Sequence, residues 1–195
     1  LMPVGLIVLG LGKAGTVANL IIEITSIGGG NVILILIITA VASYILGMIG
    51  MALIPYLFLA VTMAPAVIRL GGLDPMAVHL FLIYYVVLTG ITPPVAIVAF
   101  VAANIAGAPP MKTAFTSLRL GIVLVFVPFI FVLQPALILA GTGFEIGISL
   151  ITALLGIWWL ASGLEGYLLR VGKLKRVSRP LVAIGGLMVA LPLDW

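Results

Sequence analysis

The stretch Gly90-Ile91-Thr92-Pro93-Pro94 lies inside a run, Leu80 to Met111, that contains no charged residue. A run this long and apolar is typical of a segment that lies in lipid. The two prolines lack an N–H and their rings clash with the preceding turn, so we expect the helix to break here. The carbonyl groups that the break frees must lie inside protein or beside a water-filled cavity. In transporters, a broken helix at the middle of the membrane is where ions and substrates bind.

The composition predicts an all-α integral membrane protein. The chain is 64% hydrophobic and 7% charged, with a mean hydropathy of +1.45, which excludes a water-soluble domain of this length. Its runs are continuously apolar rather than alternating, which favours helices over a β-barrel. The absence of cysteine excludes disulfides and thiolate metal sites. The net charge of +4 gathers beside the predicted spans, so we expect membrane lipid and no nucleic acid as a partner.

Charges and glycines divide the chain into segments. The run from Ile24 to Ile68 has no charge and is too long for one span, so we expect two helical arms. The arms are two full spans, or they form a re-entrant hairpin whose tip, residues 47–52, stops inside the membrane. The first predicted segments are the end of a preceding membrane helix with a connecting segment at 1–30, the hairpin at 31–70 and a discontinuous transmembrane helix at 71–106. The last core transmembrane helix follows at 107–141, with a continuous span over 120–140. An accessory C-terminal transmembrane region at 142–195 contains a span over 146–164. We expect this last region to be truncated and the chain to be the C-terminal part of a longer protein.

Basic residues predict the orientation. The strongest basic patch lies between Glu165 and Arg179, and we place it in the cytoplasm. Counting spans back puts Lys112 and Arg119 on the same side, which agrees with a single crossing by residues 76–106. We interpret the patch as a topogenic anchor, and specific binding of anionic lipid is the alternative.

Ionisable groups are scarce in the predicted spans. Catalytic and metal sites in a membrane need such groups facing one another at depth, so we do not expect an enzyme. A membrane-embedded enzyme acting on lipid is the least supported alternative. His79 is the single histidine, and it lies near the outer end of its helix. We interpret it as a helix-packing or interfacial residue, with gating or proton coupling as the alternative.

Uncharged oxygen atoms are the remaining candidates for binding an ion or substrate. Threonine, serine and asparagine oxygens, together with the carbonyls at a break, can coordinate a small hard cation such as Na⁺. A half-helix starting at about Pro94 would point its positive end at an anionic substrate. For the break at Gly90–Pro94 we favour binding of an ion or substrate. The alternative is a structural role, in which polar side chains bond to carbonyls of their own helix or join helices. For Thr39, Ser43 and Asn104 we favour the structural role.

Two sets of short motifs occur along the chain. The first set comprises Leu46-Gly47-Met48, Ala64-Pro65, Gly72-Leu73-Asp74-Pro75, Leu88-Thr89-Gly90-Ile91-Thr92-Pro93-Pro94-Val95 and Asn104-Ile105-Ala106-Gly107. In order and spacing, this set resembles the large membrane subunit of TRAP transporters. The second set comprises His79-Leu80-Phe81, Pro110-Met111-Lys112-Thr113-Ala114-Phe115, Arg119-Leu120-Gly121 and Val127-Pro128-Phe129. This set resembles the fused small-plus-large permeases of the TAXI branch. The likeness covers roughly residues 1–140 well and the rest of the chain more loosely.

The resemblance implies a secondary transporter of the ion-transporter superfamily, in the cytoplasmic (inner) membrane of a bacterium or archaeon. It implies a soluble extracytoplasmic binding protein as partner, an organic acid as substrate, and Na⁺ or H⁺ as coupling ion with no other cofactor. The hairpin and the discontinuous helix would form one half of the transport domain. By this likeness a Na⁺ site would be formed by Gly47 at the hairpin tip and by Gly90, Thr92 and Pro94 at the break. Thr92 and Asn104 are the candidates for contact with the substrate, with the structural role above as the alternative for Asn104.

The hairpin tip departs from the TAXI pattern. After Leu-Gly-Met that pattern runs Gly-Leu/Met-Pro-Thr-Thr, whereas this chain has Ile49-Gly50-Met51-Ala52-Leu53. The departure removes two hydroxyl groups that could bind Na⁺. Backbone carbonyls could still serve, or the coupling ion could be a proton. A non-transporting scaffold or assembly subunit is the alternative function.

Overall fold

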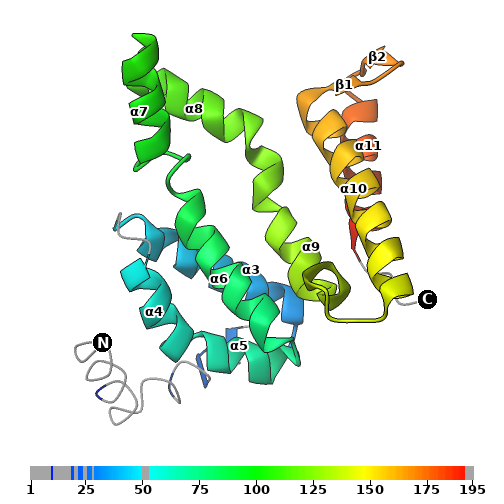
Figure 1. Ribbon diagram of the computed structural model, residues 1–195. Coiled ribbons are helices and arrows are strands. Elements are labelled where there is room, and N and C mark those ends of the chain that lie inside the picture. Colours follow the sequence, from blue (N-terminus) through cyan, green and yellow to red (C-terminus); the bar gives the residue numbers. More distant parts are fainter. Residues whose placement is uncertain are drawn as a thin grey trace. The chain divides into compact units, whose positions relative to one another are not determined.

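The computed structural model describes residues 29–49 and 53–191, together with the single positions 10, 19, 22, 23, 26 and 27. Most of the predicted connecting segment at 1–30 therefore lies outside the described residues, as do residues 50–52 of the hairpin tip. The chain divides into two compact units, Leu1–Phe115 and Thr116–Trp195, and we describe each by itself (Figure 1).

The predicted hairpin begins with α3 (Val32–Gly47), and its second arm consists of α4 (Leu53–Thr62) and α5 (Ala64–Gly71). The side chain of Asn31 caps α3 by accepting the N–H group of Ile33 at 2.9 Å. The second arm bends by 43° between α4 and α5. Pro65 lies in the first turn of α5, and its missing N–H and its ring account for this bend. The prediction of two helical arms is confirmed.

The predicted discontinuous helix is confirmed. Its first half is α6 (Pro75–Leu88), and its second half is α7 (Ile97–Ala106). Asp74 caps α6 by accepting the Ala77 N–H at 3.0 Å. The second half begins three residues later than Pro94, because Ala96 adopts a left-handed conformation with φ 39° and only then does the helix start. The chain continues into α8 (Pro110–Leu120).

The core of the first unit lies mainly between α3 and α6. These two helices have the most extensive contact in this unit. Thr39, Ser43 and Gly47 are buried and follow one another at intervals of four residues along α3. Small side chains at this spacing let two membrane helices approach closely. Among the described residues, Phe81 of α6 is the largest side chain that is fully buried.

The second unit starts with a broken segment. It comprises a 3₁₀ turn at Ile122–Val125, α9 (Val127–Leu133) and a second 3₁₀ turn at Pro135–Ile138. The prediction of one continuous span over 120–140 is therefore wrong. Prolines in the first turn of α9 and of the second 3₁₀ turn remove N–H donors that a continuous helix requires.

The rest of the second unit is a helical pair, α10 (Gly143–Glu165) and α11 (Ser178–Ala190). The strands β1 (Tyr167–Leu168) and β2 (Gly172–Lys173) form a small antiparallel turn between them. The two helices touch at their backbones, since a methyl group on Gly186 would lie 2.4 Å from the Leu160 nitrogen. The predicted span over 146–164 lies within α10.

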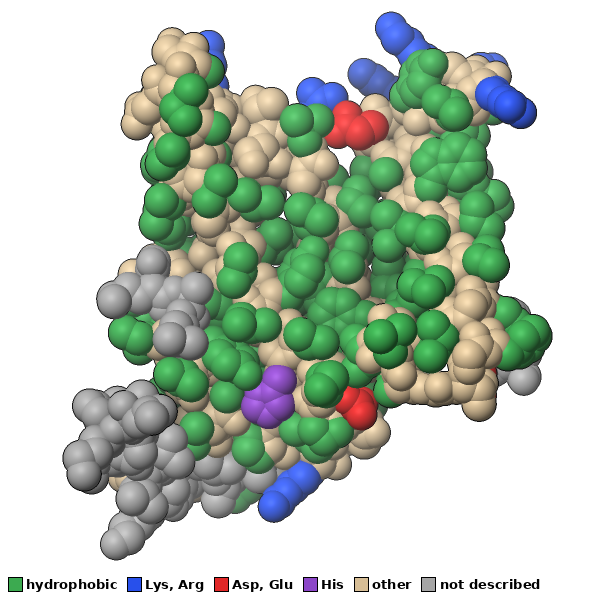
Figure 2. Space-filling model, in the orientation of Figure 1, with side chains coloured by type: hydrophobic (Ala, Val, Ile, Leu, Met, Phe, Trp, Pro, Cys, Tyr) green, Lys and Arg blue, Asp and Glu red, His purple; other side chains and the backbone are tan. Residues whose placement is uncertain are grey.

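The helices suit a membrane. Among the described residues, α10 is long and apolar enough to cross a bilayer, and up to three spans result if each of two bent helix pairs counts as one. Shorter apolar helices include α3, α6, α7 and α11. Hydrophobic side chains are spread over the visible face of both units, and charged side chains are few there (Figure 2). The fold class is the predicted one, an all-α integral membrane protein with a hairpin, a discontinuous helix and additional C-terminal helices.

Candidate functional site at the broken helix

The break between α6 and α7 folds back on itself. The Ala96 N–H donates to the carbonyl of Thr89 at 3.1 Å and to that of Thr92 at 3.0 Å, and the Val98 N–H donates to the Gly90 carbonyl at 2.9 Å. These bonds satisfy several carbonyls that the missing helical turn would leave exposed to an apolar environment. The break is therefore an ordered loop whose backbone is largely paired internally.

The hairpin tip is hydrogen-bonded to the break. The hydroxyl of Thr89 donates to the Val86 carbonyl at 2.7 Å and to the Gly47 carbonyl at 3.2 Å. A methyl group on Gly47 would lie 2.7 Å from the Val86 carbonyl oxygen, and this backbone atom cannot move aside cheaply. Glycine is therefore required at the tip for α3 to approach the end of α6.

Tyr44 makes a second connection. Its hydroxyl donates to Oγ1 of Thr92 at 2.7 Å and to the Pro93 carbonyl at 3.1 Å. The Thr92 hydroxyl in turn donates to the Leu88 carbonyl at 3.1 Å, and the Thr92 side chain is 2% exposed. Tyr44 was not among the site residues predicted from the sequence. The available signal was its position one helical turn before Gly47, which places it on the same face of α3.

The predicted site residues divide into two groups. Gly47, Gly90 and Thr92 belong to the hydrogen-bonded cluster of the tip and the break. Pro94 lies in the same loop with its side chain exposed. Among the described residues, none donates a hydrogen bond to the Pro94 carbonyl. Asn104 is exposed in the last turn of α7, roughly 12 Å along the helix axis from the break. The structure thus does not bring Asn104 to Thr92.

The other polar residues singled out from the sequence have structural partners. Thr39 and Ser43 each donate to the carbonyl four residues earlier in α3, at 2.8 and 2.7 Å. This arrangement confirms the structural interpretation of both residues. The Tyr56 hydroxyl lies 3.3 Å from Nδ1 of His79, and the two rings pack edge to face. His79 therefore joins α4 to α6, which agrees with the helix-packing interpretation, and a role in gating or proton coupling stays the alternative.

Two opposite partial charges meet at the break. The C-terminal end of α6 carries a partial negative charge and the N-terminal end of α7 a partial positive charge. In the first turn of α7 the side chains of Ile97 and Val98 are exposed, and the Val98 N–H is bonded to the Gly90 carbonyl. Within the described ranges, histidine and carboxylate side chains form no group that could hold a metal ion. The groups at the break are neutral oxygens, which suit a hard monovalent cation, beside a helix end that favours an anion.

A family model described as "Tripartite ATP-independent periplasmic transporter, DctM component" matches residues 2–146. The matched segment contains the hairpin, both halves of the broken helix and the start of α10. The remainder of α10, the strand pair and α11 follow it. Neither a curated protein nor a solved structure matches the chain.

Proposed function

Because the chain belongs to the DctM family of tripartite ATP-independent periplasmic (TRAP) transporters, we propose that it forms part of an ion-coupled permease that imports an organic acid. The family is one of secondary-transporter permeases and not of enzymes. In this proposal an extracytoplasmic binding protein delivers the substrate to a multi-pass protein of the cytoplasmic membrane. The apolar helices of both units support the membrane location.

The observation that carries the proposal is the pair of hydrogen bonds between hairpin and break. Thr89 bonds to Gly47, and Tyr44 bonds to Thr92. A ligand bound at this junction would contact both elements at once. The ligand would therefore bind more tightly when the hairpin and the break are in contact than when they are apart. Such a difference in affinity between two conformations is what coupling of an ion to transport requires.

The oxygens at the junction have spare capacity to coordinate an ion. A carbonyl oxygen has two lone pairs, and so has a hydroxyl oxygen. The Gly47 carbonyl accepts from Thr89, the Gly90 carbonyl accepts from Val98, and the Thr92 hydroxyl accepts from Tyr44. Counting only hydrogen bonds between described residues, one lone pair remains on each atom. Together with the Pro94 carbonyl, these three oxygens form the ligand set that we propose.

We further propose that the coupling ion is Na⁺. Carbonyl and hydroxyl oxygens do not take up a proton in the physiological pH range, whereas unwound carbonyls and helix C-terminal ends coordinate Na⁺ in transporters. The positive end of α7, with exposed Ile97 and Val98, would attract the carboxylate of the substrate. We also propose that the permease is of the fused TAXI type, which the ordered motifs and the helices beyond the matched segment support.

The test is uptake into proteoliposomes. The complete permease that includes this chain is reconstituted, and purified binding protein is added outside with a radiolabelled organic acid. We expect accumulation when an inward Na⁺ gradient is imposed, and none without the binding protein. Accumulation driven by a proton gradient at equal Na⁺ would replace Na⁺ by H⁺ as the coupling ion. Uptake that ignores both gradients and the binding protein would refute the proposed function.

A further inference from the structure

The segment that links α10 to α11 is basic and ordered. Residues 166–177, called the basic hairpin below, contain the strand pair β1–β2, in which Tyr167 lies opposite Lys173. Arg170 holds its tip in a left-handed conformation with φ 67°. The segment has no acidic residue. Its exposed cations are Arg170, Lys173, Lys175 and Arg176.

Exposed apolar side chains alternate with these cations. Leu169 is 63% exposed and Val171 is 68% exposed, one on each side of Arg170. Tyr167 is exposed beside its strand partner Lys173. Such side chains are poorly placed in water, but at a bilayer surface the apolar groups enter the boundary of the acyl chains while the cations stay among the headgroups.

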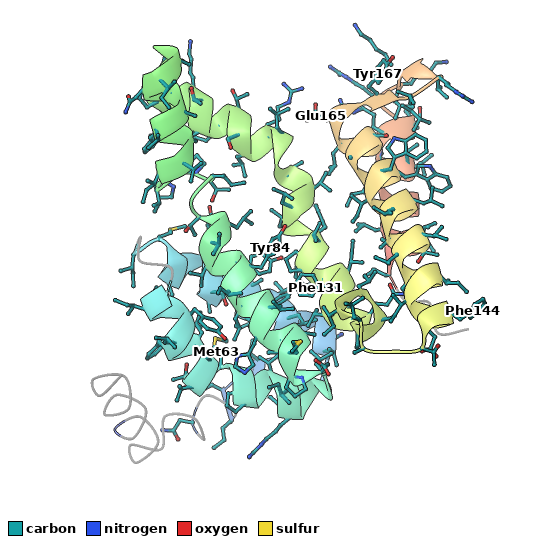
Figure 3. The ribbon with its side chains drawn as sticks, in the orientation of Figure 1. Met63, Tyr84, Phe131, Phe144, Glu165 and Tyr167 are labelled. Carbon is teal, nitrogen blue, oxygen red and sulfur yellow. The ribbon has the colours of Figure 1, made fainter. Side chains whose placement is uncertain are left out.

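The basic hairpin lies where a membrane surface is expected. It begins directly after Glu165, the last residue of α10, which is the helix long enough to cross a bilayer. Trp158 and Trp159, both exposed, lie within the last two turns of α10 and have the character of an interfacial aromatic belt. Tyr167 and Glu165 lie at this same end of α10 (Figure 3), and cations gather over it (Figure 2).

The neighbouring charges are already paired. Arg179 donates to the carbonyls of Gly163 and Leu164, so it caps the C-terminal end of α10. Arg119 pairs with Glu165 at 3.3 Å. Within the part of the chain that the structure describes, the four exposed cations of the basic hairpin have no acidic partner. Orientation by the positive-inside rule explains their sign but not the apolar side chains between them.

We propose that the basic hairpin, residues 166–177, binds the headgroups of anionic phospholipids in the leaflet that its end of α10 faces. The four cations contact the phosphates. Leu169, Val171 and Tyr167 anchor the hairpin in the boundary below them. This binding surface lies outside the segment that matches the transporter family and does not depend on transport.

Tryptophan fluorescence provides a local readout. The three tryptophans are Trp158, Trp159 and Trp195, so Trp195→Phe leaves the pair beside the basic hairpin. This variant of the full chain is reconstituted in phosphatidylcholine, and dibrominated phosphatidylglycerol or dibrominated phosphatidylcholine is added as quencher. We expect dibrominated phosphatidylglycerol to quench at a concentration at least about fivefold lower than dibrominated phosphatidylcholine, because one Lys or Arg at an anionic surface contributes about that factor to binding. This preference should fall as the salt concentration is raised.

Two variants separate lipid binding from a general effect of sequence change. Arg170→Gln, Lys173→Gln, Lys175→Gln and Arg176→Gln together should abolish the preference. The charge-conserving set Arg170→Lys, Lys173→Arg, Lys175→Arg and Arg176→Lys should keep it. Circular dichroism shows whether each variant is folded. Equal quenching by both lipids in the Trp195→Phe protein, or a preference that survives neutralisation, would overturn the proposal.

Discussion

The hydroxyl of Tyr44 donates a 2.7 Å hydrogen bond to Oγ1 of Thr92, which lies 48 residues further along the chain. The same hydroxyl reaches the Pro93 carbonyl at 3.1 Å. One side chain of the hairpin thus contacts two oxygens of the break, the Thr92 hydroxyl and the Pro93 carbonyl. These hydrogen bonds join the hairpin to the break, so we expect the geometry of the break to depend on the hairpin.

Tyr44→Phe tests this dependence. The variant keeps the ring and removes only the hydroxyl, so we expect normal expression. Hydrogen bonds between membrane helices contribute roughly 0.6–1.7 kcal/mol, so the apparent Na⁺ affinity of uptake should fall about 3- to 20-fold. Tyr56→Phe is the matched control, because it removes a hydroxyl that contacts His79 instead. Unchanged Na⁺ dependence in Tyr44→Phe would show that the bond does not shape the site.

Gly47→Ala tests the close approach of α3 to α6. The added methyl group would lie 2.7 Å from the Val86 carbonyl oxygen and 2.8 Å from its Cα, so the helices must separate. We expect a loss of roughly 1–3 kcal/mol in the free energy of unfolding, measured by denaturation in mixed micelles, together with lost transport. Gly147→Ala, where nothing lies within 4 Å, should leave transport unchanged and should leave stability unchanged or raise it by up to about 1 kcal/mol. Equal stability of the two variants would contradict the packing at the tip.

Replacing Pro93 and Pro94 together by alanine tests the need for the break. Alanine supplies the missing N–H groups and favours helix, so α6 and α7 can join into one rod. We expect transport to be abolished while the protein is still inserted in the membrane. Uptake at the parent rate would show that a discontinuous helix is not required.

The break itself was predictable because proline acts locally. The lack of an N–H in Pro93 and Pro94 disrupts the helix whatever surrounds it, and the absence of charge from Ile24 to Ile68 indicated two arms. The partners of the break were predictable only in part. The spacing of Tyr44 and Gly47 places both on one face of α3, but the contact of Tyr44 with Thr92 depends on how α3 packs on α6, which no local pattern encodes.

Two further differences have physical causes. The continuous span predicted over 120–140 relied on hydropathy, which measures how apolar a segment is but not whether Pro128 and Pro135 permit one helix. Thr92 and Asn104 were both candidates for contact with the substrate, yet the length of α7 separates the two. The order of the motifs along the chain therefore indicated the family, but it did not indicate which side chains lie close together in space.

Neighbouring glycines in α11 offer a matched test of the second unit. A methyl group on Gly186 would lie 2.4 Å from the Leu160 nitrogen, whereas one on Gly185 meets nothing within 4 Å. Gly186→Ala should destabilise the α10–α11 pair by roughly 1–3 kcal/mol. Gly185→Ala should be neutral or stabilising by up to about 1 kcal/mol. The readout is unfolding in mixed micelles, and the reverse order of stability would contradict the backbone contact.

Binding of ²²Na⁺ to the purified permease is the most direct test of the proposed ion site. Thr92→Val keeps the shape of the side chain but deletes the oxygen that faces Tyr44. Thr92→Ser restores that oxygen. We predict saturable ²²Na⁺ binding in the parent protein and in Thr92→Ser, and its loss in a folded Thr92→Val protein. Equal binding by Thr92→Val and the parent would contradict a Na⁺ site between the hairpin tip and the break, as would the absence of binding in the parent.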